Sequence, residues 1–260
     1  RGPEADRDEA FVRDFCKGLG VSLLVYRRNV PELAKERGYT LEEAGREARY
    51  ACFWEAVKKL SADRLAVAHN RDDNAETVLF HLFRGSGLKG LSGMDYRAPL
   101  RGRDGVLIRP LLDVSRKEIE AYLKERETPF CQDGTNASEE YSRNRIRLNI
   151  LPEARKINEE AAANIVRAAG MLKETGRFLE VQAGAWLEER ARIGEREICL
   201  PGEALLEAGE PLSGLILRMA FERLTGSLKD LTRRHGDAAL LLAEKGTGRK
   251  LSLPGGVTVR

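Results

Sequence analysis

The sequence predicts an α/β fold in which a parallel sheet flanked by helices is followed by a mainly helical domain. Strand-like and helix-like segments alternate in the first part of the chain, as in folds built from strand–helix–strand units. One apolar run, Arg64 to Ala68, has no charge between its central residues, which is typical of a central parallel strand. After Pro152 the chain is rich in Ala, Glu and Arg and lacks strand-like runs. We therefore predict domains at residues 1–152 and 153–260.

The segment before this strand is predicted to hold two helices and a further strand. Glu9 to Leu19 places apolar residues at helical spacing, and Val21 to Tyr26 has the continuous apolar character of a strand. Thr40 and Glu43 form a capping box, which marks a helix start, and this helix is expected to reach about Leu60.

The later elements follow from the same signals. Val106 to Leu112 is predicted to be a strand, and Ser115 with Glu118 forms a capping box for a helix that ends near Arg126. The second domain is predicted to contain three helical segments and a strand-like segment around a Pro-Gly-Gly turn, at residues 158–192, 205–224, 231–243 and 250–260.

Polar side chains gather where the central strand ends and the next helix begins. Asp72 or Asp73 can cap this helix, and Asp73, Glu76 and Thr77 share one face of its first turn. His69 lies at the end of the strand, where open parallel sheets bind their ligands. Capping explains Asp72 alone. A second Asp, a Glu on the same face and a His exceed what capping requires, so the spacing favours a functional site.

The composition excludes several classes of protein. With 42% hydrophobic and 33% charged residues, the chain is globular rather than disordered. Its apolar runs are too short to cross a bilayer and no signal peptide opens the sequence, so we expect a cytoplasmic protein without a membrane partner. The 4 cysteines form no CxxC pair and the 3 histidines are dispersed, so neither a disulfide framework nor a metal site is predicted.

The net charge is only +3, but basic residues are clustered. Tyr141 to Lys156 holds four Arg and one Lys against a single Glu. A second basic zone consists of Arg84, Lys89, Arg97, Arg101, Arg103, Arg109 and Arg116. A solvated surface explains scattered arginines, but clusters beside a ligand site favour contact with phosphate or an RNA backbone.

Three motifs, taken together, resemble one family. They are AHNRDDNAETVLFHLFRGSGLKGLSGM, IRPLLDVSRKEIEAYL and DGTNASEEYSRNRIRLNILP, in this order. The chain resembles bacterial tRNA(Ile)-lysidine synthetases, which are N-type ATP pyrophosphatases, from Arg1 to Arg260. The resemblance implies that the first domain is a parallel-sheet nucleotide-binding domain and that the mainly helical domain contacts tRNA.

The resemblance also implies a reaction. Members of this family use ATP to adenylate the carbonyl oxygen of the wobble cytidine in a tRNA(Ile) with a CAU anticodon. The side-chain amine of free L-lysine then displaces AMP and gives lysidine. The implied cofactors are ATP and Mg²⁺, the implied partners are this tRNA and lysine, and a homodimer is left open.

The motifs assign roles residue by residue. Two carboxylates would hold the lysine ammonium and one would accept its proton, but the sequence does not say which. Cations would offset the charge that develops during adenylation. The implied catalytic residues are Asp73, Glu76, Arg49 and Arg145; the carboxylates bind lysine, and the implied ATP contacts are His69, Thr77 and Arg143. The implied tRNA contacts are Arg84, Asn144, Arg147, Arg155, Lys156, Arg233 and Arg234.

Structural roles compete with several of these assignments. His69 either orients Asp73, contacts the nucleotide or is an ordinary strand-end histidine. Arg49 lies near the expected inner face of its helix, but it can instead pair with Glu43 or Glu47 on the surface. Asn144 can recognise RNA or cap the following helix.

The chain departs from the family pattern in two ways. The phosphate-binding loop Ser-Gly-Gly-x-Asp-Ser is absent from the 260 residues, so we expect a longer parent protein whose first strand and loop precede Arg1. Asn70 and Asn74 replace the usual His and Gln but keep their hydrogen-bonding capacity. The alternatives are another tRNA-modifying ATP pyrophosphatase, such as a cytidine thiolase, and a noncatalytic tRNA-binding fragment. The lack of a CxxC pair counts against the thiolase.

Overall fold

The computed structural model describes residues 2–100, 105–131, 142–245 and 248–260. Its contacts divide the chain into two compact units, Arg1–Gly170 and Met171–Arg260. The division falls inside one long helix, α9 (Ala161–Arg190), which contributes residues to both units. A functional boundary at residue 152 stays a prediction.

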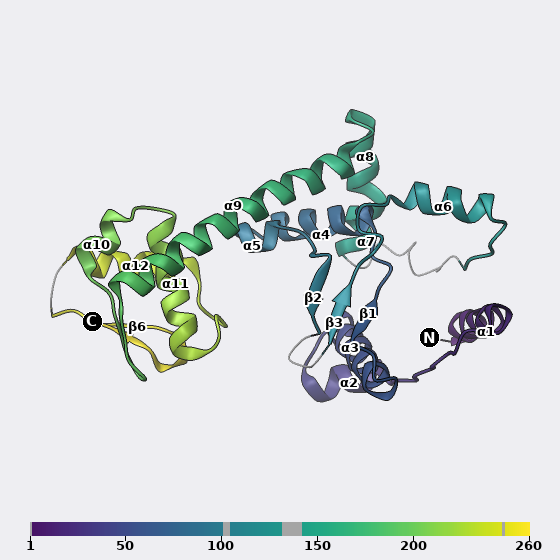
Figure 1. Cartoon of the computed structure of the whole chain (residues 1–260), viewed down its shortest axis with the longest axis horizontal. Coiled ribbons are helices and arrows are strands. Elements are labelled where there is room, and N and C mark those ends of the chain that lie inside the picture. Colours follow the sequence, from purple (N-terminus) through teal and green to yellow (C-terminus); the bar gives the residue numbers. More distant parts are fainter. Residues whose placement is uncertain (1, 101–104, 132–141, 246–247) are drawn as a thin grey trace. The chain divides into compact units, whose positions relative to one another are not determined.

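The first unit contains a mixed three-stranded sheet. β1 (Arg64–Ala66) and β3 (Val106–Ile108) are parallel, as predicted, and β2 (Arg97–Pro99) pairs with β3 in the antiparallel direction. The strand order is β1-β3-β2, with all three side by side in Figure 1. The predicted parallel pairing is therefore present, but the sheet as a whole is mixed. The sequence did not predict β2, because three residues ending in proline show no alternation of apolar and polar residues. The proline is tolerated because β2 is an edge strand.

Three helices precede the sheet: α1 (Gly2–Leu19), α2 (Val30–Arg37) and α3 (Leu41–Lys59). The predicted strand at Val21 to Tyr26 was wrong, because this segment pairs with no strand in the described residues. An apolar run becomes a strand only where a neighbour supplies a hydrogen-bonding ladder. Asn29 caps α2 instead, by accepting a hydrogen bond from the amide of Glu32.

Helix α3 anchors the sheet. Its capping box of Thr40 and Glu43 is confirmed, with each side chain bonded to the backbone amide of the other. Val57 of α3 packs with Leu100 and Leu107 of the sheet region in one hydrophobic cluster. This contact fixes the strands against the helix and leaves their carboxyl ends free to carry polar residues.

Helix α4 (Arg71–Phe83) begins beyond the end of β1 (Figure 1). The prediction that Asp72 or Asp73 caps it was wrong, because Asn70 is the N-cap and Asp73 is its partner in a capping box. The Asn70 amide oxygen accepts from the Asp73 N–H, and the Asp73 carboxylate accepts from the Asn70 N–H, each at 3.0 Å. The sequence offers adjacent capping residues, and the end of the extended chain decides which one is used.

Five shorter helical segments and α9 complete the first unit: α5 (Leu88–Leu91), α6 (Arg116–Glu125), α7 (Ser142–Arg145), the π-helical η2 (Ile146–Ile150) and α8 (Leu151–Ile157). The predicted Ser115–Glu118 capping box of α6 is confirmed. Ala75 of α4 packs with Ile146, Leu151 and Ala162 in a second cluster. This cluster holds the arginine-rich segment against α4.

The second unit is helical with two short hairpins. Its elements are the end of α9, β4 (Arg192–Ile193), β5 (Ile198–Cys199), α10 (Gly202–Glu207), α11 (Leu212–Thr225), α12 (Arg233–Glu244), β6 (Leu251–Ser252), the 3₁₀ turn η3 (Pro254–Gly256) and β7 (Thr258–Val259). β4 pairs with β5 and β6 with β7, both antiparallel. The Pro-Gly-Gly turn is confirmed, whereas the β4–β5 hairpin was not predicted because two-residue strands carry no periodicity.

The predicted helix at 205–224 is two helices, α10 and α11. Gly209 adopts a φ of +65° between them, and Pro211 has no backbone N–H to donate to a helical hydrogen bond. The core of this unit consists of Ala183, Trp186, Leu187, Leu205, Ile216 and Ala220. In the described part of the chain, no helix is long and apolar enough to cross a membrane.

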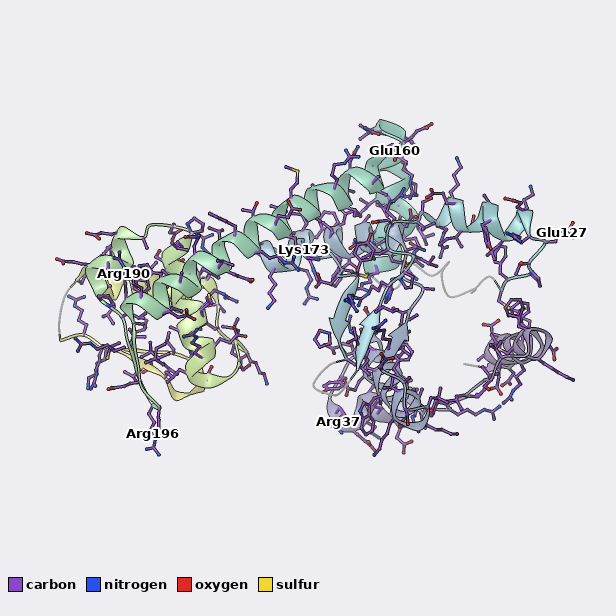
Figure 2. All side chains as sticks on the ribbon, viewed as in Figure 1. Arg37, Glu127, Glu160, Lys173, Arg190 and Arg196 are labelled. Carbon is purple, nitrogen blue, oxygen red and sulfur yellow. The ribbon has the colours of Figure 1, made fainter. Side chains whose placement is uncertain are left out.

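Leu187→Ala should lower the free energy of unfolding by about 3 kcal/mol, because a fully buried leucine leaves a cavity when truncated. Urea denaturation followed by circular dichroism measures the loss. Phe178→Ala is the control, since Phe178 lies on the same helix, beyond the Lys173 that Figure 2 labels, and is 64% exposed. Equal losses in the two variants would contradict the assigned core.

Candidate functional site

The candidate site is built on the first turn of α4. The capping box uses one carboxylate oxygen of Asp73 and leaves the other facing outward. Glu76 lies one turn further, with its side chain only 5% exposed. The structure thus brings together the two carboxylates that the sequence predicted to share a face.

A single guanidinium bridges these carboxylates. Arg147, from η2, donates to both oxygens of Glu76 at 2.6 and 2.9 Å and to the free oxygen of Asp73 at 3.0 Å. The sequence analysis assigned Arg147 to tRNA, and nothing in its spacing indicated this pairing, which joins residues 71 and 74 positions apart. An RNA contact of Arg147 stays a prediction.

Burial governs the protonation of Glu76. It raises the pKa of this carboxyl above its ordinary value of 4.5, the hydrogen bond and charge of Arg147 oppose the rise, and the neighbouring Asp73 adds to it. Glu76 in turn raises the pKa of Arg147, which stays charged. A buried carboxylate with a raised pKa that is paired with one arginine is suited to accept a proton.

A second, positively charged region surrounds His69. Arg109, which is buried, donates from Nε to His69 Nδ1 at 3.3 Å and from Nη1 to the carbonyl of Asp95 at 2.6 Å. Burial lowers the pKa of His69 below 6.5, and the charges of Arg109, Arg49 and Arg143 lower it further against the opposing charge of Asp73. The neutral ring therefore carries its proton on Nε2. Three arginines near a strand end suit a phosphate-bearing ligand.

Arg109 is the functional candidate that the sequence analysis missed. It appeared there only as a member of the second basic zone. A signal existed, because Arg109 follows the apolar run of β3 as His69 follows that of β1, and β1 and β3 are parallel. Polar residues after neighbouring parallel strands lie at the same edge of the sheet.

Asp72 has a structural role, but it holds α6 and α8 instead of capping α4 as predicted. Its carboxylate accepts from the backbone N–H of Arg116 at 2.7 Å, at the start of α6, and from the guanidinium of Arg155 in α8. Arg155, predicted to contact tRNA, is thus engaged within the fold. Lys156 is exposed and pairs with Glu153 at 2.6 Å.

The remaining predicted residues are dispersed. The Thr77 hydroxyl donates to the carbonyl of Asp73 at 2.9 Å, and Arg49 is exposed beside a separate cavity, so the expected inner-face position of Arg49 was wrong. In the second unit, Arg233 pairs with Glu210 at 3.4 Å and Arg234 is exposed. Their roles in binding stay predictions.

Four further candidates lie around the C-terminal half of α4. The guanidinium carbons of Arg84 and Arg143 lie 5.1 and 5.4 Å from the Phe80 ring centre, and Arg145 lines a cavity beside this ring. Asn144 lies half-buried in α7. Arg101, Arg103 and residues 132–141 of the third motif lie outside the described residues.

The described residues do not fit a magnesium site. No group of three or more His, Cys, Asp or Glu side chains among them is arranged to hold a metal ion. Asp73 and Glu76, the nearest pair of hard oxygen donors, are bridged by Arg147. The following mechanism therefore uses protein groups alone.

Arg147→Ala should raise the pKa of Glu76 further, because the arginine opposes the effect of burial. Carbon-13 NMR titration of the carboxyl groups measures the shift, with Glu76→Gln assigning the signal. Because the folded-state pKa is raised, the stabilising contribution of Glu76 is fully present below its unfolded-state pKa and is lost as the pH rises through the folded-state pKa. The Arg147→Ala variant should therefore keep this contribution to a higher pH than the original protein. Arg155→Ala, which breaks a pair with Asp72 only, is the control. An unchanged or lower Glu76 pKa in Arg147→Ala would refute this account.

Comparison with known proteins places these features in a family. The model of the PP-loop domain matches residues 2–154. The tRNA(Ile)-lysidine synthase of Caldanaerobacter subterraneus subsp. tengcongensis is 34% identical over 255 residues, which cover 98% of this chain and 53% of the relative. That of Clostridioides difficile is 35% identical over 264 residues, covering 100% of this chain and 56% of the relative.

A solved structure shares the fold. The U34-tRNA thiolase NcsA from Methanococcus maripaludis, with its [4Fe-4S] cluster, matches with a TM-score of 0.54 at 20% identity, over 67% of this chain and 59% of that one. The chain spans about half the length of the curated relatives it matches. An extension before Arg1 stays a prediction. The family model matches more than half of the chain and shows that the chain belongs to the PP-loop domain family, and over nearly its whole length the chain is similar to tRNA(Ile)-lysidine synthases.

Proposed function

We propose that this chain carries the catalytic carboxylates of an ATP-dependent ligase that couples free L-lysine to the wobble cytidine of a tRNA(Ile) with a CAU anticodon. The observation that carries the proposal is the pair Asp73 and Glu76, held by one guanidinium on the first turn of α4. A site that already holds a nitrogen cation on two carboxylates suits a lysine ammonium. The family and the tRNA(Ile)-lysidine synthase relatives support the same reaction.

The first step would be adenylation of the cytidine. The carbonyl oxygen attacks the α-phosphate of ATP, an oxygen–phosphorus bond forms, and pyrophosphate leaves. Negative charge spreads over the phosphate oxygens during this transfer. We expect the charges of Arg109, Arg49 and Arg143, which all lower the pKa of His69, to offset it, and the His69 Nε2 proton can donate to a phosphate oxygen.

The second step would use the carboxylate pair. The lysine ammonium takes the place of the Arg147 guanidinium, and its N–H groups donate to Asp73 and Glu76. Glu76 then accepts a proton, since burial has raised its pKa, and the neutral amine attacks the ring carbon. The carbon–nitrogen bond forms and AMP leaves with the electrons of the carbon–oxygen bond. The Asp73 side chain keeps the amine in place.

A tRNA thiolase is the alternative that the shared fold of NcsA brings forward. Chemistry based on an iron–sulfur cluster requires cysteine ligands that converge. Here Cys16, Cys52, Cys131 and Cys199 lie on different elements, and no metal-binding group is found among the described residues. Lysine-dependent release of pyrophosphate separates the ligase both from a thiolase and from a noncatalytic tRNA-binding fragment.

Asp73→Asn and Glu76→Gln should each weaken lysine binding at least tenfold and reduce lysine transfer to tRNA(Ile) by 100-fold or more, since each removes a charge that pairs with the ammonium. Calorimetry with L-lysine and transfer of radiolabelled lysine to a tRNA(Ile) transcript measure the two effects. Asp72→Asn is the matched control. It makes the same change at the adjacent position, where the amide still accepts from the Arg116 N–H, and should leave lysine affinity intact. Unchanged lysine binding in both test variants would remove the proposed site.

Arg147→Ala should tighten L-lysine binding about tenfold, because the bound arginine competes with the ammonium for the same oxygens. Arg147→Lys keeps a cation at this position and should stay close to the original affinity. Arg155→Ala removes the neighbouring arginine–aspartate pair without touching Glu76, and serves as the control. Weaker lysine binding in Arg147→Ala would show that the arginine positions the carboxylates instead of competing for them.

A further inference from the structure

A groove lies along the C-terminal half of α4, apart from the carboxylate pair. Its volume is about 420 Å³, and it is lined by Phe80, Phe83, Arg84, Arg145, Ile146, Asn149 and Ile150. These residues come from α4, the end of α7 and η2. Phe83 is 60% exposed, so its ring is accessible to a ligand in the groove.

The walls of the groove combine aromatic rings with cations. Two guanidinium groups, from Arg84 and Arg143, lie within 5.1 and 5.4 Å of the Phe80 ring centre. The arginines that line the groove are Arg84 and Arg145, and none of the lining residues is acidic. The Nε atom of Arg143 is buried without a hydrogen-bond partner.

The combination of aromatic rings and arginines indicates which class of ligand the groove binds. A purely apolar ligand gains nothing from two arginines, and a free phosphate gains nothing from two phenylalanine rings. A nucleobase stacks on aromatic or guanidinium planes, while its phosphate pairs with arginine. The amide of Asn149 adds a group that can hydrogen-bond a base edge. The volume falls within the range of small-ligand sites.

The position of the groove favours RNA over ATP as the source of the base. The nucleotide site of an open parallel sheet lies at the carboxyl ends of the strands, where α4 begins. Phe80 and Phe83 belong to the far half of α4. Phe80 follows Glu76 by four residues, so it lies on the same face about 6 Å further along the helix axis.

We propose that this groove binds one unpaired base of the tRNA anticodon loop by stacking on Phe83, with an adjoining phosphate on Arg84 or Arg145. The proposal rests on the proposed function, which makes this RNA the substrate. It adds a base-binding subsite one helical turn beyond the carboxylates, and thereby explains why the arginines of residues 143–145 share a segment with Arg147.

The test uses the anticodon stem–loop of tRNA(Ile) as an RNA hairpin, with 2-aminopurine placed at one loop position at a time. Stacking in the groove should quench the fluorescence at one position. Phe83→Ala should remove this quenching and weaken hairpin binding about tenfold. Arg145→Glu should weaken binding by at least as much and reduce its dependence on salt.

Tyr122→Ala is the matched control. Tyr122 is 57% exposed on α6, and Arg126 lies 5.4 Å from its ring centre, but it lines no part of the groove. It should leave both quenching and affinity unchanged. Circular dichroism should show that Phe83→Ala folds as the original does, since this side chain is mostly exposed.

Three results would overturn the proposal. Hairpin binding and quenching that survive both Phe83→Ala and Arg145→Glu would exclude the groove as an RNA site. Loss of ATP affinity in Phe83→Ala, with RNA binding intact, would assign the groove to the adenine of ATP. Equal losses in Tyr122→Ala would show a general effect of exposed aromatics. L-lysine calorimetry separates the two proposals. If the groove binds no RNA base, lysine can still bind at the carboxylates. If lysine does not bind, the groove can still quench the fluorescence of the hairpin.

Discussion

The pairing of Arg147 with Asp73 and Glu76 is the interaction on which the rest of the site depends. A carboxylate as buried as Glu76 is costly unless a cation and hydrogen bonds compensate it, and removal of the cation leaves an uncompensated buried charge. The pair also fixes η2 against α4, beside the packing of Ala75 on Ile146 and Leu151. The same ion pairs therefore neutralise the buried carboxylate and hold the arginine-rich segment against α4. A ligand that replaces the Arg147 guanidinium would change both the local charge and the attachment of this segment.

The start of α4 separates two charge environments within one unit. Carboxylates face Arg147 on one side, while Arg109 contacts His69 at the strand end and the charges of Arg49 and Arg143 also act on this histidine. A cationic amine suits the first environment and a phosphate suits the second. In the proposed ligation the amine and the nucleotide differ in this way, and such a site would hold them without placing like charges together. Asp72, which lies between His69 and Asp73 in the sequence, stabilises the fold by accepting hydrogen bonds from Arg116 and Arg155.

The shared fold with a U34-tRNA thiolase shows how much of the chemistry resides in individual side chains. A fold accommodates different reactions when residues at the strand ends change and the framework is kept. In this chain the cysteines are scattered, and the paired carboxylates occupy the first turn of the helix that follows β1. Family membership therefore rests on the motifs and the long matches to lysidine synthases, and the fold alone is compatible with either chemistry.

The sequence by itself determined the helix starts at Thr40 and Ser115, the strand at Arg64, the shared face of Asp73 and Glu76, and the family, because capping boxes, apolar runs and helical spacing act over a few residues. The tertiary structure decided what depends on distant partners. Val21 to Tyr26 formed no strand because no neighbour pairs with it in the described residues, and β2 became a strand because β3 does pair with it. The contacts of Arg147 with Glu76 and of Arg109 with His69 join residues far apart in the chain. Interactions between residues close in the sequence determine which side chains share a helical turn, whereas only the packing of the whole unit determines which charged side chains form pairs.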